Sequence, residues 1–125
     1  MATGIIDPIT IAVQFNNCIN SRDSKGLFAL MSDDHVFIDT ACNYFKGKEK
    51  CTTAWSGFFI MFPDYQNIFE VTTSKGDTAY IQGYSTCSDK RLEGKCLWTA
   101  KILNNKVTEW RVYTDNADNR RILGL

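Results

Sequence analysis

Two residues of the stretch 35–40 (HVFIDT) carry side chains that could do chemistry, the carboxylate Asp39 and the chain's only histidine, His35. The stretch is rich in β-branched and aromatic residues and predicts a strand with His35, Phe37 and Asp39 on one face. A carboxylate among apolar groups is desolvated, so its pKa rises and it can take a proton from carbon next to a carbonyl. An aspartate at a strand end also commonly accepts backbone N–H bonds, and this structural role is the alternative.

The remaining candidate ligands and thiols favour neither a metal site nor a disulfide framework. Asp33 and Asp34 precede His35, but the trio fits a turn between a helix and a strand better than a metal site. The cysteines are odd in number and include no CxxC pair, so we expect small apolar side chains in a reduced compartment. They are Cys18, Cys42, Cys51, Cys87 and Cys96. Without a glycine-rich phosphate loop or a nucleotide fingerprint, we expect no cofactor and no metal.

Length and composition predict one domain over residues 1–125. The chain is 44% hydrophobic and 13% aromatic, enough for one core and too short for two ordinary domains. Its 14 basic and 14 acidic residues form no block of like charge, so we expect no nucleic-acid or membrane partner. The first ten residues lack a basic start and a long apolar run, and we expect a cytosolic protein.

The elements that must position Asp39 centre on a predicted hairpin over residues 95–115. Two runs of strand formers flank Asn104 and Asn105, a pair suited to a turn with positive φ, which sets Leu103 opposite Lys106. Counting outward, this register predicts that one face carries Leu97, Thr99, Lys101, Thr108, Trp110, Val112 and Thr114. The other face then carries Cys96, Trp98, Ala100, Ile102, Val107, Glu109, Arg111, Tyr113 and Asp115.

Both faces of this hairpin hold large apolar side chains, so both should be covered. We expect the helices to cover the first face. On the other, Ile102 opposite Val107 and Trp98 opposite Arg111 would form an apolar patch pointing away from the helices. Monomers rarely leave such a patch in water, so we expect a homodimer through it.

The rest of the chain predicts helices first and then long antiparallel strands. Asp7 caps a helix that ends near Asn20, and Asp23 caps a short second helix with Met31 among its inward residues. A loop over residues 43–47 leads to a third helix over residues 48–62. Extended runs over residues 65–74 and 78–87 form another hairpin, residues 88–94 a loop and residues 116–125 a tail. We therefore predict an α+β fold in which a curved antiparallel sheet wraps around a long helix and leaves a cavity.

In order and spacing, these motifs resemble the SnoaL-like branch of the nuclear-transport-factor-2-like superfamily, from about residue 9 to residue 115. The resemblance rests on residues 20–23 (NSRD), 31–34 (MSDD), 36–39 (VFID), 45–47 (FKG), 62–64 (FPD) and 105–111 (NKVTEWR). It implies a cone-shaped α+β barrel with a deep apolar pocket, often a homodimer through the sheet's outer face. Members include steroid isomerases, polyketide cyclases, dehydratases, epoxide hydrolases and proteins without a reaction.

The resemblance implies different things for each chemistry of the family. Asp39 falls where ketosteroid isomerases carry their catalytic base, but their two enolate donors correspond here to Phe15 and Thr99, so that route is doubtful. The water-activating aspartate of limonene-type epoxide hydrolases corresponds to Val112, and two of its partners correspond to Gly83 and Ser85, which excludes that activity. For polyketide cyclisation the one candidate is Asp115, which our register puts at the rim or the outer face, where a cap for the tail is the better interpretation.

Two hypotheses follow for a pocket that takes a small apolar or carbonyl-bearing molecule. In the first, the protein is a cofactor-free isomerase, cyclase or dehydratase with Asp39 as general base. In the second, the same pocket binds a ligand without turnover, or the fold serves as a protein-docking module. The residues expected to line the pocket and contact the ligand are Phe15, Phe37, Tyr44, Trp55, Phe59, Thr99, Trp110, Val112 and Thr114.

Overall fold

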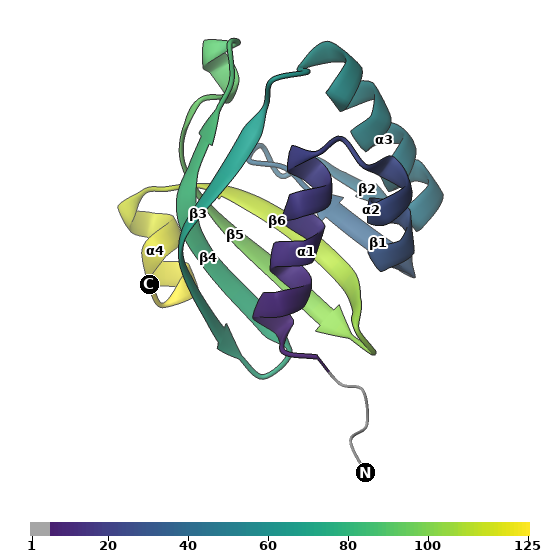
Figure 1. The fold of residues 1–125 in the computed structure, drawn as a ribbon. Helices are drawn as coiled ribbons and strands as arrows, with labels where there is room; N and C mark the ends of the chain where they lie inside the picture. The colour runs from purple at the N-terminus through teal and green to yellow at the C-terminus, as the bar shows by residue number, and fades with distance from the viewer. Residues whose placement is uncertain (1–5) are drawn as a thin grey trace.

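The computed structural model describes residues 6–125 and contains four α-helices and one six-stranded sheet. In chain order the elements are α1 (Pro8–Asn20), α2 (Ser24–Leu30), β1 (Met31–Ile38), β2 (Tyr44–Lys46), α3 (Lys48–Met61), β3 (Gln66–Lys75), β4 (Thr78–Thr86), a 3₁₀ turn (Lys90–Leu92), β5 (Gly94–Leu103), β6 (Lys106–Thr114) and α4 (Ala117–Leu123). Figure 1 shows α1 lying across one side of the curved sheet, α2 and α3 beside β1 and β2, and α4 near the opposite edge. The predicted α+β class and the curved sheet packed on helices are confirmed.

The helix starts follow the predicted capping chemistry. The Asp7 carboxylate accepts the backbone N–H of Ile9 at 2.7 Å, and Pro8 occupies the first helical position. Asp23 accepts the N–H of Gly26 at 2.9 Å and so starts α2. The third helix begins after Gly47, whose φ of 100° suits glycine, and ends before Phe62 and Pro63.

The sheet has the strand order β2-β1-β6-β5-β4-β3 and is not wholly antiparallel. The first strand pairs with β2 in antiparallel and with β6 in parallel orientation, so the prediction of a purely antiparallel sheet needs this correction. Met31 was expected in the second helix, but it begins β1 and lies opposite Val107. The expected loop over residues 43–47 contains the short strand β2, and the expected tail contains α4. Those two elements are only three and seven residues long, too short for a clear hydrophobic period.

The predicted hairpin turn is correct, but the register beyond it is not. Asn104 and Asn105 have φ of 52° and 61°, and Leu103 lies opposite Lys106. Ile102 then pairs with Val107 and Lys101 with Glu109, so Thr108 is an extra residue on β6. This β-bulge shifts every later pair by one residue. The side chain of Trp110 consequently shares a face with Trp98, whereas the uninterrupted count had placed the two on opposite faces.

The bulge also corrects the surface predicted for a homodimer. Trp98, Ile102 and Val107 are at most 5% exposed and belong to the core between the helices and the sheet's inner face. Arg111 lies on the other, outer face, where its guanidinium sits 4.7 Å from the centre of the Tyr113 ring rather than over Trp98. The patch predicted from these four residues therefore does not exist as a surface of the folded chain.

Candidate functional site

A cavity of about 740 Å³ lies between the inner face of the sheet and α3. Side chains of β1, β2, β3, β5, β6 and α3 form its walls, and the chain just before and at the start of β5 forms its rim. Its lining comprises Phe37, Asp39, Thr40, Phe45, Ala54, Trp55, Phe58, Tyr65, Asn67, Arg91, Leu92, Glu93, Gly94, Lys95, Cys96, Trp98, Trp110, Val112, Thr114 and Asp115. The volume suits a molecule of two or three fused rings.

The walls of the cavity are mainly aromatic. Trp55 meets Phe37 edge-on with ring centres 5.2 Å apart and Phe58 at 5.7 Å. On the sheet side Trp110 packs on Phe15, with ring centres 4.6 Å apart. All three tryptophans of the chain line this cavity. Such edge-to-face and offset contacts hold large rings in place, which makes the walls a rigid apolar surface.

One buried polar group interrupts the apolar walls. It lies where β3 begins and β4 ends. The hydroxyls of Tyr65 and Ser85 are 3.0 Å apart, and Ser85 donates to Asn67 Oδ1 at 2.8 Å. Ser85 is 1% and Asn67 3% exposed. Burial raises the pKa of Tyr65 to about 12, so its hydroxyl keeps its proton at neutral pH.

The thiol of Cys96 lies at the edge of this group. Its Sγ is 3.7 Å from Ser85 Oγ and 3.6 Å from the carbonyl of Gly94. Burial raises the pKa of the thiol, so the nucleophilic thiolate is disfavoured. Cys96 is therefore a half-buried lining residue rather than a reactive one.

Asp39 lines the cavity, as expected for a base, but its carboxylate is already engaged. Oδ1 accepts the backbone N–H groups of Ala41 and Asn43, each at 2.9 Å. Oδ2 accepts the side-chain amide of Asn43 at 3.3 Å. The carboxylate thus holds the loop between β1 and β2 by hydrogen bonds. This is the structural role that the sequence offered as the alternative to a catalytic base.

Asp115, another carboxylate of the cavity lining, is paired. Arg120 of α4 donates to both of its oxygens, at 2.6 and 2.8 Å, and its guanidinium also reaches Gln82 Oε1 at 3.1 Å. Hydrogen bonds from Arg120 hold the pKa of Asp115 below its usual range, so Asp115 is ionised at neutral pH. It ties α4 to the sheet and is not available as an acid.

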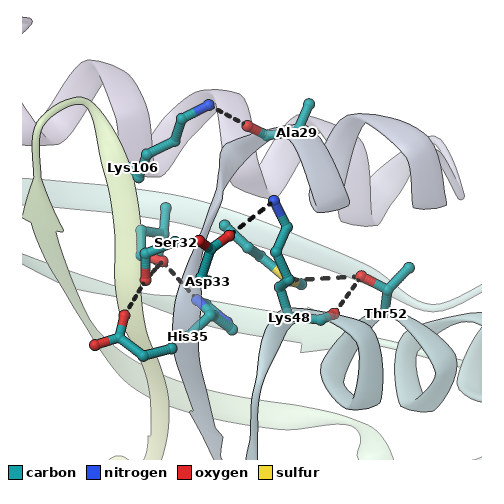
Figure 2. Close-up of polar contacts among 10 residues, drawn as sticks. Ala29, Ser32, Asp33, His35, Lys48, Thr52 and Lys106 are labelled. Carbon is teal, nitrogen blue, oxygen red and sulfur yellow. Dashed lines mark hydrogen bonds and ion pairs between the residues drawn. The ribbon is translucent and has the colours of Figure 1, made fainter.

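His35 lies on the same face as Phe37 but outside the cavity, in a packed corner between β1 and β6 (Figure 2). Its ring is fully buried, with Nδ1 2.6 Å from the carbonyl oxygen of Val107 and Nε2 without a partner among the described residues. Burial lowers the pKa of this ring, which is therefore neutral at pH 7 and donates from Nδ1. Around it, Lys106 donates to the carbonyl of Ala29 and Lys48 faces Asp33 at 3.8 Å.

The structure brings together only part of the predicted ligand-contacting set. Phe37, Trp55, Trp110, Val112 and Thr114 line the cavity. Their contact with a ligand stays a prediction.

The other four residues of that set lie elsewhere, each for a local reason. Phe15 is fully buried beneath Trp110, and Phe59 stacks on the far side of Trp55 with ring centres 5.7 Å apart. Tyr44 is 68% exposed because alternation along β2 turns Phe45, not Tyr44, toward the cavity. Thr99 points to the outer face, 3.4 Å from the Tyr113 hydroxyl, since the bulge gives its expected place to Trp98.

Sequence reasoning missed the polar group of Tyr65, Asn67 and Ser85. Alternation over residues 65–69 would have placed Tyr65 and Asn67 on one face, and this was the available signal. It was missed because the stretch was used only to predict a strand. Phe58 of α3 also lines the cavity, although it was not in the predicted ligand-contacting set.

Comparisons with known proteins decide the family. The model of the SnoaL-like domain matches residues 12–115. The chain belongs to the SnoaL-like family. No curated protein matches the sequence. Within residues 6–125, no helix is both long and apolar enough to cross a membrane.

Solved structures of the same fold agree with this SnoaL-like assignment. An NTF2-like protein of unknown function from Cytophaga hutchinsonii has a TM-score of 0.74 at 11% identity, over 99% of this chain and 100% of that one. An LEH-like epoxide hydrolase from M. tuberculosis has a TM-score of 0.76 at 15% identity, over 86% and 82%. IdmH, a proposed polyketide cyclase from Streptomyces antibioticus, has a TM-score of 0.74 at 16% identity, over 96% and 100%. At these identities the likeness shows the fold.

Proposed function

We propose that this SnoaL-like protein binds a small, largely apolar molecule in the cavity between α3 and the inner face of the sheet. The observation that carries the proposal is the aromatic wall built from Phe37, Trp55, Phe58, Trp98 and Trp110 around about 740 Å³ of space. Pockets of this size with apolar walls and few polar groups are typical of sites for small organic ligands. Desolvation of the ligand against these rings supplies the affinity.

The hydrogen bonds made by Asp39 and Asp115 favour ligand binding without a catalysed reaction. A general base needs a lone pair free to take a proton within hydrogen-bonding reach of the substrate. Oδ1 of Asp39 is occupied by two backbone N–H groups, and Asp115 is held by Arg120. Neither of these two carboxylates is the unpaired group that a general base requires.

The test is calorimetric titration with 2-acetylnaphthalene, a two-ring ketone small enough for the cavity. We expect saturable one-site binding to the wild type. Ala54→Trp inserts a large ring into the wall of the cavity and should abolish that binding. The matched control is Ile60→Trp, on the same helix but at a position 82% exposed and not part of the lining, which should bind normally. Equal binding by both variants would refute the proposed site.

A second candidate function, proton transfer by Asp39, rests on one observation. Oδ2 of Asp39 receives only a 3.3 Å bond from the Asn43 side chain, and the residue lines the cavity. Exchange of the acetyl protons of 2-acetylnaphthalene in D₂O, followed by NMR, separates the two functions. Exchange catalysed by the wild type and lost in Asp39→Asn would establish the enzyme. Under the binding function, exchange in the presence of protein matches the buffer rate.

We also propose a homodimer, through a different surface from the one predicted from the sequence. The outer face of β2, β1 and β6 carries Tyr44, Ile38, Arg111 and Tyr113, because Ile38 pairs with both Tyr44 and Arg111, and Tyr113 follows Arg111 by two residues. An apolar and aromatic sheet face of this kind can pair with its own copy around a twofold axis. Sedimentation velocity on the wild type and on Tyr113→Glu tests it: dimer in the first and monomer in the second is the expected result.

A further inference from the structure

The buried group of Tyr65, Ser85 and Asn67 has a fixed direction of hydrogen bonding. A serine hydroxyl carries one proton, and Ser85 donates it to Asn67 Oδ1 at 2.8 Å. In the 3.0 Å contact with Tyr65, Ser85 can then only accept, so the Tyr65 hydroxyl is the donor. The raised pKa of Tyr65 keeps that proton in place at neutral pH. The chain of donors therefore runs from Tyr65 through Ser85 and ends on the Asn67 side-chain oxygen.

The Asn67 side chain cannot easily turn away from this arrangement, because its backbone is tied to α1. The Asn67 N–H donates to Asn20 Oδ1 at 2.9 Å. Its carbonyl accepts the side-chain amides of Asn20 at 2.9 Å and Asn16 at 3.3 Å. With both backbone groups held and Oδ1 bonded to Ser85, the orientation of the amide is set.

Donors at the cavity wall that have no partner within residues 6–125 include the indole N–H of Trp55 and the side-chain amide of Asn67. Asn67 lines the cavity and is only 3% exposed, yet its Nδ2 donates to no partner within residues 6–125. An amide N–H₂ of a lining residue that has no acceptor on the protein is free to donate to an acceptor that enters the cavity at that point. The neighbouring Tyr65 and Ser85 protons are already used, so Asn67 is the one member of this group with protons to give.

We propose that Asn67 determines specificity by donating from Nδ2 to a hydrogen-bond acceptor on the ligand, such as a ketone, ester or ether oxygen. The site thereby selects an apolar molecule that carries an uncharged oxygen at one end over the same molecule with a hydrocarbon group there. A carboxylate or a phosphate is disfavoured beside Asn67, because the group of Tyr65, Ser85 and Asn67 holds no cation and the two cations of the lining, Arg91 and Lys95, belong to the rim. This inference rests on the proposed binding function.

The experiment compares two probes of the same shape, 2-acetylnaphthalene and 2-isopropenylnaphthalene, in which a methylene replaces the carbonyl oxygen. Calorimetry on the wild type should show about fivefold tighter binding of the ketone, the size of one net hydrogen bond. Asn67→Leu should remove this preference while still binding the alkene. Ser85→Ala, which leaves Asn67 in place but releases its amide, should reduce the preference, and it serves where Asn67→Leu does not fold.

The outcomes separate this inference from the proposed function. Equal affinities of the wild type for the two probes would overturn the role of Asn67 and leave the binding function standing. Binding of neither probe would overturn both. A preference that disappears in Tyr65→Phe and persists in Asn67→Leu would also overturn the assignment, since it would make the tyrosine hydroxyl the donor to the ligand.

Discussion

Asp39 Oδ1 accepts the backbone N–H of Asn43 at 2.9 Å, so the carboxylate that looked most like a catalytic base closes its own loop. The same oxygen accepts the N–H of Ala41. This loop joins β1 to β2 and sits at the rim of the cavity, where Asp39 and Thr40 line the wall. Asp39 thus fixes the shape of this part of the cavity rim.

This arrangement predicts unequal effects of two substitutions at Asp39. Asparagine keeps the accepting oxygen, so Asp39→Asn should lower the free energy of unfolding by less than about 0.5 kcal/mol, whereas Asp39→Ala should lower it by about 1 to 2 kcal/mol. Urea denaturation of the two variants and the wild type measures both changes. Equal losses in the two variants would show that the charge, and not the acceptor geometry, matters.

The buried ring of His35 predicts a loss of stability on mild acidification. Burial lowers its pKa below the ordinary value of about 6.5, so between the folded pKa and about 6.5 the unfolded chain binds more protons than the folded one. The free energy of unfolding therefore falls as pH is lowered through that window, by at most about 1.4 kcal/mol per pH unit. Since His35 is the only histidine, its ring resonances report the titration directly.

A matched variant isolates the effect of His35 from that of the carboxylates. His35→Gln cannot titrate, so its free energy of unfolding should vary less between pH 7 and pH 5 than that of the wild type. Parallel pH profiles for the two proteins, or a ring that titrates near 6.5 in the folded state, would contradict the buried neutral histidine.

The buried hydroxyl of Tyr65 leads us to expect a loss of stability as pH rises in the alkaline range. Its pKa is about 12 in the folded protein and about 10 in an unfolded chain, so above pH 10 the folded state binds more protons. The free energy of unfolding should fall as pH rises from 10 to 12, and Tyr65→Phe should lose less over the same range. NMR of ¹³Cζ-labelled tyrosine gives the individual pKa values. A Tyr65 signal that titrates with the exposed tyrosines would refute the buried donor.

At Gly83 the backbone of β3 leaves no room for a side chain. A Cβ there would lie 1.9 Å from the carbonyl oxygen of Ile68, because β3 carries an irregularity between Phe69 and Val71 and approaches β4 closely. Gly83→Ala should lower the free energy of unfolding by about 2 kcal/mol or more. The control is Gly57→Ala in α3, where a Cβ meets nothing within 4 Å and where helix propensity predicts a gain of about 0.5 to 1 kcal/mol. An unchanged midpoint for Gly83→Ala would contradict the close approach.

The sequence predicted the parts of the fold that depend on local signals. Capping by Asp7 and Asp23, the end of the third helix near residue 62 and the Asn104-Asn105 turn each involve a few neighbouring residues, and each is found close to where it was expected. The SnoaL-like resemblance was confirmed because those signals occur in the family's order.

The site was harder to predict because it depends on register. One extra residue on β6, Thr108, exchanges the faces of the strand beyond it, and no local signal in a run of strand formers marks such a bulge. That single residue explains why Thr99 was placed in the cavity and why Trp98 was placed outside it. The polar group of Tyr65, Ser85 and Asn67 joins two strands, and only the pairing of β3 with β4 brings it together.

The most direct test of the binding site uses the three tryptophans, since all of them line the cavity. In ¹H–¹⁵N correlation spectra, titration with 2-acetylnaphthalene should shift the indole N–H signals of Trp55, Trp98 and Trp110 along one saturating curve. The backbone amide of Gly76, in the distant β3–β4 turn, should stay in place. Indole signals that do not move while other signals saturate would place the ligand elsewhere and contradict the account.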